Sequence, residues 1–112
     1  MNNKQTTIKD SVSLEGVGIH TGKDVKLTFH PAKENTGYIF KRVDLGDKPE
    51  IEALAKYVVN TQRGTTLEKD GVKLKTTEHV LAALVGLEID NILIEINAEE
   101  PPIMDGSSKF FV

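Results

Sequence analysis

Residues 75–87 have the sequence KTTEHVLAALVGL, which decides the fold because its periodicity predicts one helix. Four apolar side chains recur at i, i+3, i+4 and i+7 and therefore share one helix face: Val80, Ala83, Leu84 and Leu87. Either Thr76 or Thr77 can serve as the N-cap, and Gly86 is expected near the end of the helix. The stretch therefore predicts an amphipathic helix that packs on the rest of the chain.

An acidic and an imidazole side chain, Glu78 and His79, lie side by side in the first turn of this predicted helix. A first turn carries unpaired N–H groups and a partial positive charge, which favour a carboxylate anion and an uncharged imidazole. An uncharged imidazole can bind a metal ion, and a neighbouring carboxylate can act as a base. The pair alone leaves two interpretations open: a favourable first-turn acid beside a surface histidine, or a general base beside a metal ligand.

The composition restricts the possible classes of function. The chain has 112 residues, enough for one domain with a small core, and its formal net charge of −3 does not favour nucleic-acid binding. Because it contains no cysteine, a metal site must use His, Asp or Glu, and a cytoplasmic location is expected. Residues 1–7 include no apolar segment typical of a secretory signal, and no apolar run approaches the roughly 20 residues of a membrane span.

Alternating apolar residues predict strands on both sides of the helix. The predicted strands are Thr6–Leu14, Val25–His30, Tyr38–Val43, Tyr57–Val59, Thr65–Lys69, Val72–Lys75 and Ile92–Ile96. The last of these is apolar enough to be central in its sheet. Gly16–Gly22 is predicted to be a loop, Pro31 to end the second strand, and Asp70-Gly71 to form a hairpin turn. Residues 51–55 fit either a strand or a helical turn.

The last residues predict the start of a second helix. Ser107 is a suitable N-cap, and Phe110, Phe111 and Val112 begin an apolar face that has no continuation. A single helical turn is far shorter than the roughly 12 residues at which isolated helices become marginally stable. We therefore expect the chain to be a fragment of a longer protein, although an extended tail packed on the surface would explain the same residues.

Three blocks of the sequence occur in the order found in a known family. They are GVGIHTG at 16–22, TTEHVLAAL at 76–84 and IMDGS at 103–107, with Asp90-Asn91 before the last predicted strand. Together they closely resemble the N-terminal half of UDP-3-O-acyl-N-acetylglucosamine deacetylase, the zinc hydrolase of lipid A synthesis in Gram-negative bacteria. The resemblance extends over essentially the whole chain, from Lys4 to Val112.

This resemblance implies an α+β fold, in which a mostly antiparallel sheet carries helices on one face and forms the first of two similar domains. Residues 1–112 would be this N-terminal domain, with a first helix that begins at Thr77 and a truncated second helix that begins at Ser107. A small inserted sheet of short strands is expected within Leu45–Lys75. The second domain would lie outside this sequence.

The resemblance also implies the chemistry. The family hydrolyses the acetamide of UDP-3-O-acyl-N-acetylglucosamine with Zn²⁺, which polarises the carbonyl and makes water a better nucleophile. The pattern implies that His79 is one of three protein ligands to zinc and that Glu78 is the general base. The other two ligands, a His-x-x-x-Asp pair, would come from the second domain of the same polypeptide. We therefore expect this chain alone to be inactive and not to hold zinc tightly.

Two further positions are implied near the cleft between the domains. His20 is a candidate for substrate contact, with a plain loop residue between glycines as the alternative. Asp105, in the IMDGS block, is a candidate for a cleft or substrate role, with a turn carboxylate that caps backbone N–H groups as the alternative. His30, before Pro31, is interpreted as a surface residue.

Two departures and two rival functions accompany this interpretation. Thr77 stands where the family usually has valine, and Pro101 stands where isoleucine is common, which leaves the loop path before Asp105 open. One rival is a non-catalytic binding module in which Gly16–Gly22 cradles a phosphate with its N–H groups. The other is an interaction domain that its partner holds through Phe110–Val112.

Overall fold

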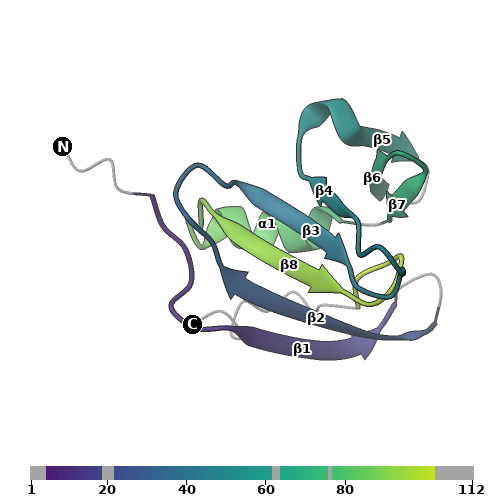
Figure 1. The fold of residues 1–112 in the computed structure, drawn as a ribbon, viewed down its shortest axis with the longest axis horizontal. Helices are drawn as coiled ribbons and strands as arrows, with labels where there is room; N and C mark the ends of the chain where they lie inside the picture. The colour runs from purple at the N-terminus through teal and green to yellow at the C-terminus, as the bar shows by residue number, and fades with distance from the viewer. Residues whose placement is uncertain (1–4, 19–21, 62–63, 76, 103–112) are drawn as a thin grey trace.

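A computed structural model describes residues 5–18, 22–61, 64–75 and 77–102 of the 112-residue chain. It is an α+β fold with a five-stranded sheet, a separate three-stranded sheet and one described α-helix, as predicted (Figure 1). The larger sheet contains β1 (Val12–Val17), β2 (Asp24–Pro31), β3 (Tyr38–Arg42), β4 (Glu50–Glu52) and β8 (Ile92–Ile96). The smaller contains β5 (Val58–Thr61), β6 (Gly64–Lys69) and β7 (Val72–Leu74), and the helix is α1 (Glu78–Gly86).

The strand β8 lies at the centre of the larger sheet, whose order is β1-β2-β8-β3-β4. It pairs antiparallel with β2 and parallel with β3, and the two remaining pairings, β1–β2 and β3–β4, are antiparallel. The central place predicted for Ile92–Ile96 is therefore confirmed. Three of its residues, Ile92, Ile94 and Ile96, are completely buried, and Ile94 pairs with both Phe29 and Phe40.

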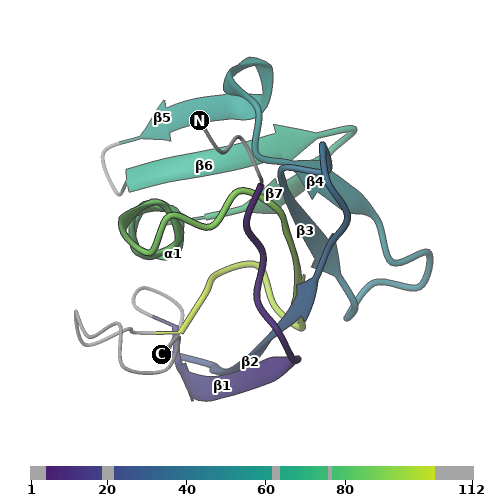
Figure 2. The same ribbon diagram turned by 90° about the vertical axis from the view of Figure 1, so that its left-hand side faces the viewer.

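The helix α1 covers one face of the larger sheet (Figure 2). Alternation along the strands sends the apolar side chains to this face, and the helix adds Val80 and Leu84, which are almost fully buried. The core that results is formed by Leu14, Val25, Leu27, Phe29, Phe40, Ile51, Leu67, Leu74, Val80, Leu84, Ile89, Ile92, Ile94 and Ile96.

The first strand differs from the prediction at both ends. It begins at Val12 rather than Thr6, because the backbone of Thr6 bonds elsewhere: its N–H donates to Asp90 Oδ2 at 2.8 Å, and its carbonyl accepts from Asp90 and Asn91. It also continues to Val17, because Gly16 pairs with Val25 in the ladder with β2. Gly16 and Val17 of the predicted glycine loop therefore belong to the strand.

The helix is shorter than the predicted 75–87 and begins and ends differently. Thr77 occupies the N-cap position, but its side chain does not cap the helix. At the far end, Gly86 is the last helical residue, and the left-handed residue is Glu88, with φ of +59°. The N–H of Glu88 donates to the carbonyl of Val85 and that of Ile89 to Leu84, which is a Schellman motif. The buried pair Leu84 and Ile89 seals this end of the helix.

The three-stranded sheet is an insert between β4 and α1, within the range 45–75 expected from the family resemblance. Its β6–β7 hairpin turns at Asp70 and Gly71, whose φ angles of +52° and +80° fit a type I′ turn and confirm the predicted one. Of residues 51–55, which the sequence left open, the first two end β4, residues 53–54 connect it to the next element, and Ala55 begins a 3-10 helix, η1 (Ala55–Tyr57).

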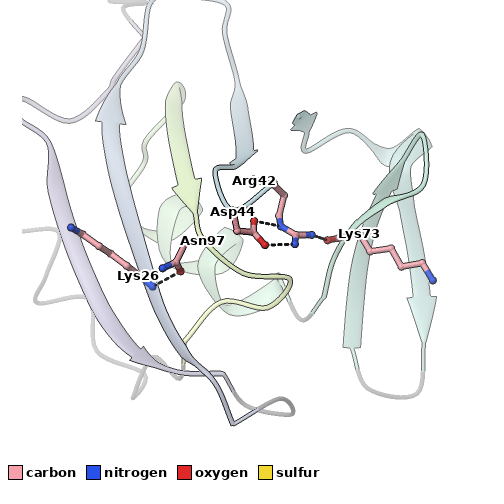
Figure 3. A network of polar contacts seen from close by, with 5 residues as sticks. All are labelled: Lys26, Arg42, Asp44, Lys73 and Asn97. Atoms are coloured by element: carbon pink, nitrogen blue, oxygen red, sulfur yellow. Dashed lines mark hydrogen bonds and ion pairs between the residues drawn. The ribbon is translucent and has the colours of Figure 1, made fainter. Parts of the chain in front are cut away.

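Polar contacts join this insert to the larger sheet (Figure 3). Arg42, at the end of β3, donates from Nη1 to the carbonyl of Lys73 in β7 at 2.8 Å. Its other nitrogens form two bonds to the Asp44 carboxylate, at 2.9 and 2.7 Å. Lys75, just after β7, donates its N–H to the carbonyl of Glu99 and pairs with the Glu99 carboxylate at 2.6 Å.

Candidate functional site

The candidate site lies at the first turn of α1, where the chain leaves the insert and enters the helix. Figure 2 shows β6 of the insert beside α1, and the hydrogen bonds of Thr65 with Thr77 and Glu78 place the start of β6 at this end of the helix. Glu78 is the first helical residue and His79 the second, so both predicted site residues are held by the junction of the two elements. Val80 and Leu84, anchored in the core, fix the orientation of this turn.

Glu78 is half-buried and is held by the insert. Its Oε1 accepts a hydrogen bond from the backbone N–H of Thr65, at the start of β6, over 3.1 Å. The carbonyl of Thr65 accepts two further hydrogen bonds from Thr77, one from the backbone N–H at 3.0 Å and one from the side-chain hydroxyl at 3.3 Å. The bond of Thr77 to the insert explains why its side chain does not cap the helix.

His79 is exposed, on the side of α1 that faces away from the core. Ala82, Val85 and Gly86 are exposed on the same helix, and Val85 leaves 64% of its surface accessible. A single exposed apolar side chain such as Val85 is ordinary on a protein surface. The imidazole therefore lies on an open face, where groups from outside the described residues can approach it.

The residues present can supply part of a metal site. Within residues 5–18, 22–61, 64–75 and 77–102, no three His, Cys, Asp or Glu side chains come close enough together to hold a metal ion. His79 offers an accessible imidazole nitrogen, which is a suitable zinc donor, and Glu78 offers a carboxylate in the adjacent position. The pair therefore fits a zinc site only as a contributor to a larger set of ligands.

The other two predicted site residues, His20 and Asp105, lie outside the described residues. The segments that lead to them are adjacent, because Gly18 and Pro102 form an isolated antiparallel bridge. The loop of His20 and the block of Asp105 therefore start from neighbouring points of the fold, a proximity that the sequence did not predict.

The glycine loop does not favour the rival phosphate-binding function. The N–H of Gly18 donates to the carbonyl of Lys23 at 2.9 Å, and that of Gly22 donates to the carbonyl of Gly18 at 3.1 Å. A phosphate cradle requires N–H groups that point at the ligand. These two are engaged within the loop itself.

His30 has more partners than the predicted surface residue would need. Its Nδ1 lies 2.8 Å from the hydroxyl of Ser11, and its Nε2 lies 2.6 Å from Oε1 of Glu95. All three lie on the sheet face opposite α1, because Leu27 and Phe29, on the other face of β2, point into the core. The sequence could not reveal this cluster, since it depends on β2 and β8 being neighbours.

No helix in the described part of the chain has the length and apolarity that crossing a membrane requires.

Comparison with known proteins gives one consistent family. The family model described as "LpxC: UDP-3-O-acyl N-acetylglycosamine deacetylase" matches residues 5–112. A relative named UDP-3-O-acyl-N-acetylglucosamine deacetylase, from Saccharophagus degradans, is 50% identical over 109 residues, which are 97% of this chain and 36% of that protein. Relatives named bifunctional enzyme LpxC/FabZ are 55% identical over 107 residues in Chlorobaculum tepidum and 53% identical over 109 residues in Bacteroides thetaiotaomicron.

The match covers nearly all of this chain but only part of each relative. The two bifunctional relatives match 96% and 97% of this chain, but the matched part is only 23% and 24% of their own length. The chain thus spans about a third of the deacetylase relatives and about a quarter of the bifunctional ones.

Proposed function

The chain belongs to the UDP-3-O-acyl-N-acetylglucosamine deacetylase family, and we propose that it forms the N-terminal domain of a zinc-dependent enzyme of that type. The complete enzyme would remove the acetyl group from UDP-3-O-acyl-N-acetylglucosamine in lipid A biosynthesis, in the cytoplasm of Gram-negative bacteria. The observation that carries the proposal is the pairing of a held carboxylate, Glu78, with an exposed imidazole, His79, at one helix terminus.

The proposed reaction is amide hydrolysis. Water forms a bond to the acetyl carbon and loses a proton, the bond from that carbon to nitrogen breaks, the leaving nitrogen takes up a proton, and acetate and a free amine result. Zinc, when bound, supplies Lewis-acid chemistry that makes the carbonyl more electrophilic and water more acidic. Glu78 would take a proton from the attacking water, for which a carboxylate held in place is suited. His79 would supply one ligand to the metal.

The proposal requires a second source of ligands. A catalytic zinc in proteins has three protein ligands, and His79 can provide one of them. We propose a second domain of the same polypeptide as that source, because His79 is exposed on α1 and open to ligands from elsewhere in the protein. His20 and Asp105 stay candidates for contact with substrate or cleft.

Two substitutions in the complete protein test the assignment. Glu78→Gln should lower kcat for deacetylation of UDP-3-O-acyl-N-acetylglucosamine by about 10²-fold or more while zinc content is retained, because the base is lost and its shape is kept. His79→Ala should lower both zinc content and activity. His30→Ala is the matched control, because His30 lies on the opposite sheet face and should leave both unchanged. Full activity of Glu78→Gln or His79→Ala would refute the proposal.

The isolated 112-residue chain provides a separate test. We propose that it neither hydrolyses the substrate nor retains zinc, because it lacks the other ligands. Metal analysis after dialysis measures this directly, and zinc retained at one ion per chain would contradict the proposed division of ligands between two domains.

A further inference from the structure

The strand β6 of the insert extends further than its partner. Residues 67–69 of β6 pair with 72–74 of β7, whereas Gly64, Thr65 and Thr66 continue beyond the end of that ladder. On the β5 side, Thr65 lies opposite Asn60. Backbone groups of a strand need partners on both edges, so the edge of β6 that β7 leaves uncovered must be satisfied in another way.

The start of α1 takes the place of the missing part of β7. The carbonyl of Thr65 accepts from the N–H of Thr77 at 3.0 Å, as it would from a neighbouring strand. The N–H of Thr65 donates to Oε1 of Glu78 at 3.1 Å, so a side-chain carboxylate stands where a strand carbonyl would be. The hydroxyl of Thr77 adds a bond to the same carbonyl at 3.3 Å.

From this juxtaposition we propose that Thr65 is a positioning residue for the reaction: its backbone N–H holds one oxygen of the Glu78 carboxylate and so directs the other toward the attacking water. This inference rests on the proposed function, because it matters only if Glu78 is the base. It assigns to the inserted sheet a role in orienting the carboxylate, which the helix alone does not hold.

The arrangement has a physical rationale. A glutamate side chain at an exposed helix terminus samples several rotamers, and fixing one oxygen removes most of them. A hydrogen bond from a backbone N–H to a carboxylate is charge-assisted and therefore stronger than one between neutral groups. Because Thr77 is completely buried and bonded to the same residue, the strand cannot move away from the helix without breaking three bonds at once.

The decisive experiment replaces the Thr65 amide with an ester in the complete protein, which removes the N–H and keeps the side chain. Proline at this position would also remove the N–H, but it could disturb the strand. The matched control is an ester at Val59 of β5, which lies opposite Thr66 in the β5–β6 ladder and leaves the peptide bonds on both sides of Thr65 as amides. Both esters remove one strand donor, but only the first removes the contact with Glu78.

We expect the Thr65 ester to lower kcat by about 10- to 100-fold, with KM changed less than about twofold, because misplacing a catalytic group affects the chemical step rather than substrate binding. The Val59 ester should change kcat less than about twofold. Thr77→Val removes the hydroxyl bond, keeps both backbone bonds and introduces the residue that is usual in the family, so it should change kcat less than about twofold.

A spectroscopic readout tests the contact independently of activity. In Glu78→Ala, the amide proton of Thr65 should move upfield and exchange with solvent about tenfold faster, while that of Thr66 stays unchanged. An unchanged Thr65 amide, or equal kcat values for the two esters, would overturn the inference. If Glu78→Gln itself retained full activity, the proposed function would fail instead, so the two failures can be told apart.

Discussion

The two sheets bury their side chains to different degrees. In the larger sheet, Leu27, Phe29 and Ile94 are completely buried under α1. In the insert, Val58 and Val59 of β5 are 38% and 45% exposed, although Leu67 and Leu74, which pair across β6 and β7, reach the common core. The larger sheet is thus stabilised mainly by apolar burial, whereas the insert depends on a few buried side chains and on polar contacts at its borders.

This difference has a consequence for the candidate site. The borders of the insert are formed by Arg42 with Lys73, by Lys75 with Glu99, and by Thr65 with the first turn of α1. Segments with few buried apolar contacts open locally at lower free energy than the core does. The proposed base is therefore held by the less stable of the two sheets, and substitutions in the two sheets should have separable effects.

The largest effect is expected at the centre of the core. Ile94→Ala should lower the free energy of unfolding of the chain by about 2–5 kcal/mol, because it removes a fully buried side chain between Phe29 and Phe40. Val59→Ala, in the exposed strand β5, should cost less than about 1 kcal/mol. Urea unfolding measures both, and equal costs would contradict the contrast drawn between the sheets.

The next effect concerns the border between the sheets. Arg42→Met should lower the free energy of unfolding by about 2–3 kcal/mol, because it leaves the carbonyl of Lys73 and the carboxylate of Asp44 without their charged donor. Asp44→Asn is the control: it keeps an acceptor for Arg42 and should cost less. If both cost the same, the bond to Lys73 would not join the insert to the sheet.

This border also gives a pH dependence. The hydrogen bonds from Arg42 lower the pKa of Asp44 below its ordinary value of 3.8. A carboxyl group with a lowered pKa in the folded state adds stability above its ordinary pKa, and that stability is lost as the pH falls through the folded value. As the pH falls below the ordinary pKa of Asp44, the original chain should therefore lose stability more steeply than Arg42→Met. Parallel losses in urea unfolding over that range would contradict the pairing.

Much of the fold follows from local pattern. The alternation in 92–96, the apolar spacing of Val80 and Leu84, and the Asp70-Gly71 turn each carry their own physical cause, so they were predicted from the sequence. The order of the strands was not predicted, because pairing of β8 with β2 and β3 joins segments more than 50 residues apart. The extent of β1 was missed for a related reason, since Thr6 bonds to Asp90 and Asn91 instead of a strand.

In the candidate site, too, some features could be predicted from the sequence and others could not. Glu78 and His79 are predicted site residues that rest on residue type and on the family resemblance. The contact of Glu78 with Thr65 could not be recognised, because it depends on a strand that extends past its neighbour and on a backbone N–H that no residue type reveals. Thr77 was expected only as a possible cap, and its bond to Thr65 became visible once the insert was placed beside the helix.

A smaller effect is expected at the hairpin turn of the insert. Gly71 has φ of +80°, and an added Cβ there would meet no atom within 4 Å, so the cost of Gly71→Ala is one of backbone conformation alone. That cost should be about 1–2 kcal/mol. Hydrogen exchange should show it as faster opening of β6 and β7, with amides of β8 unaffected. Equal acceleration in both sheets would mean that the insert and the core unfold as one unit.

The smallest effect is expected at Glu88, a residue with positive φ that is not glycine, at the end of the helix that covers the larger sheet. Glu88 has φ of +59° and ends α1 in a Schellman motif, where glycine is the residue best suited to the left-handed conformation. Glu88→Gly should raise the free energy of unfolding by about 0.5–1 kcal/mol, because the relief of strain exceeds the added freedom of the unfolded chain. Glu88→Ala is the control, since it removes the same carboxylate but keeps a Cβ and should not stabilise the chain. A gain of the same size in both variants would trace the effect to the lost charge rather than to the backbone. Amide hydrogen exchange in β5–β7 should stay unchanged in both variants.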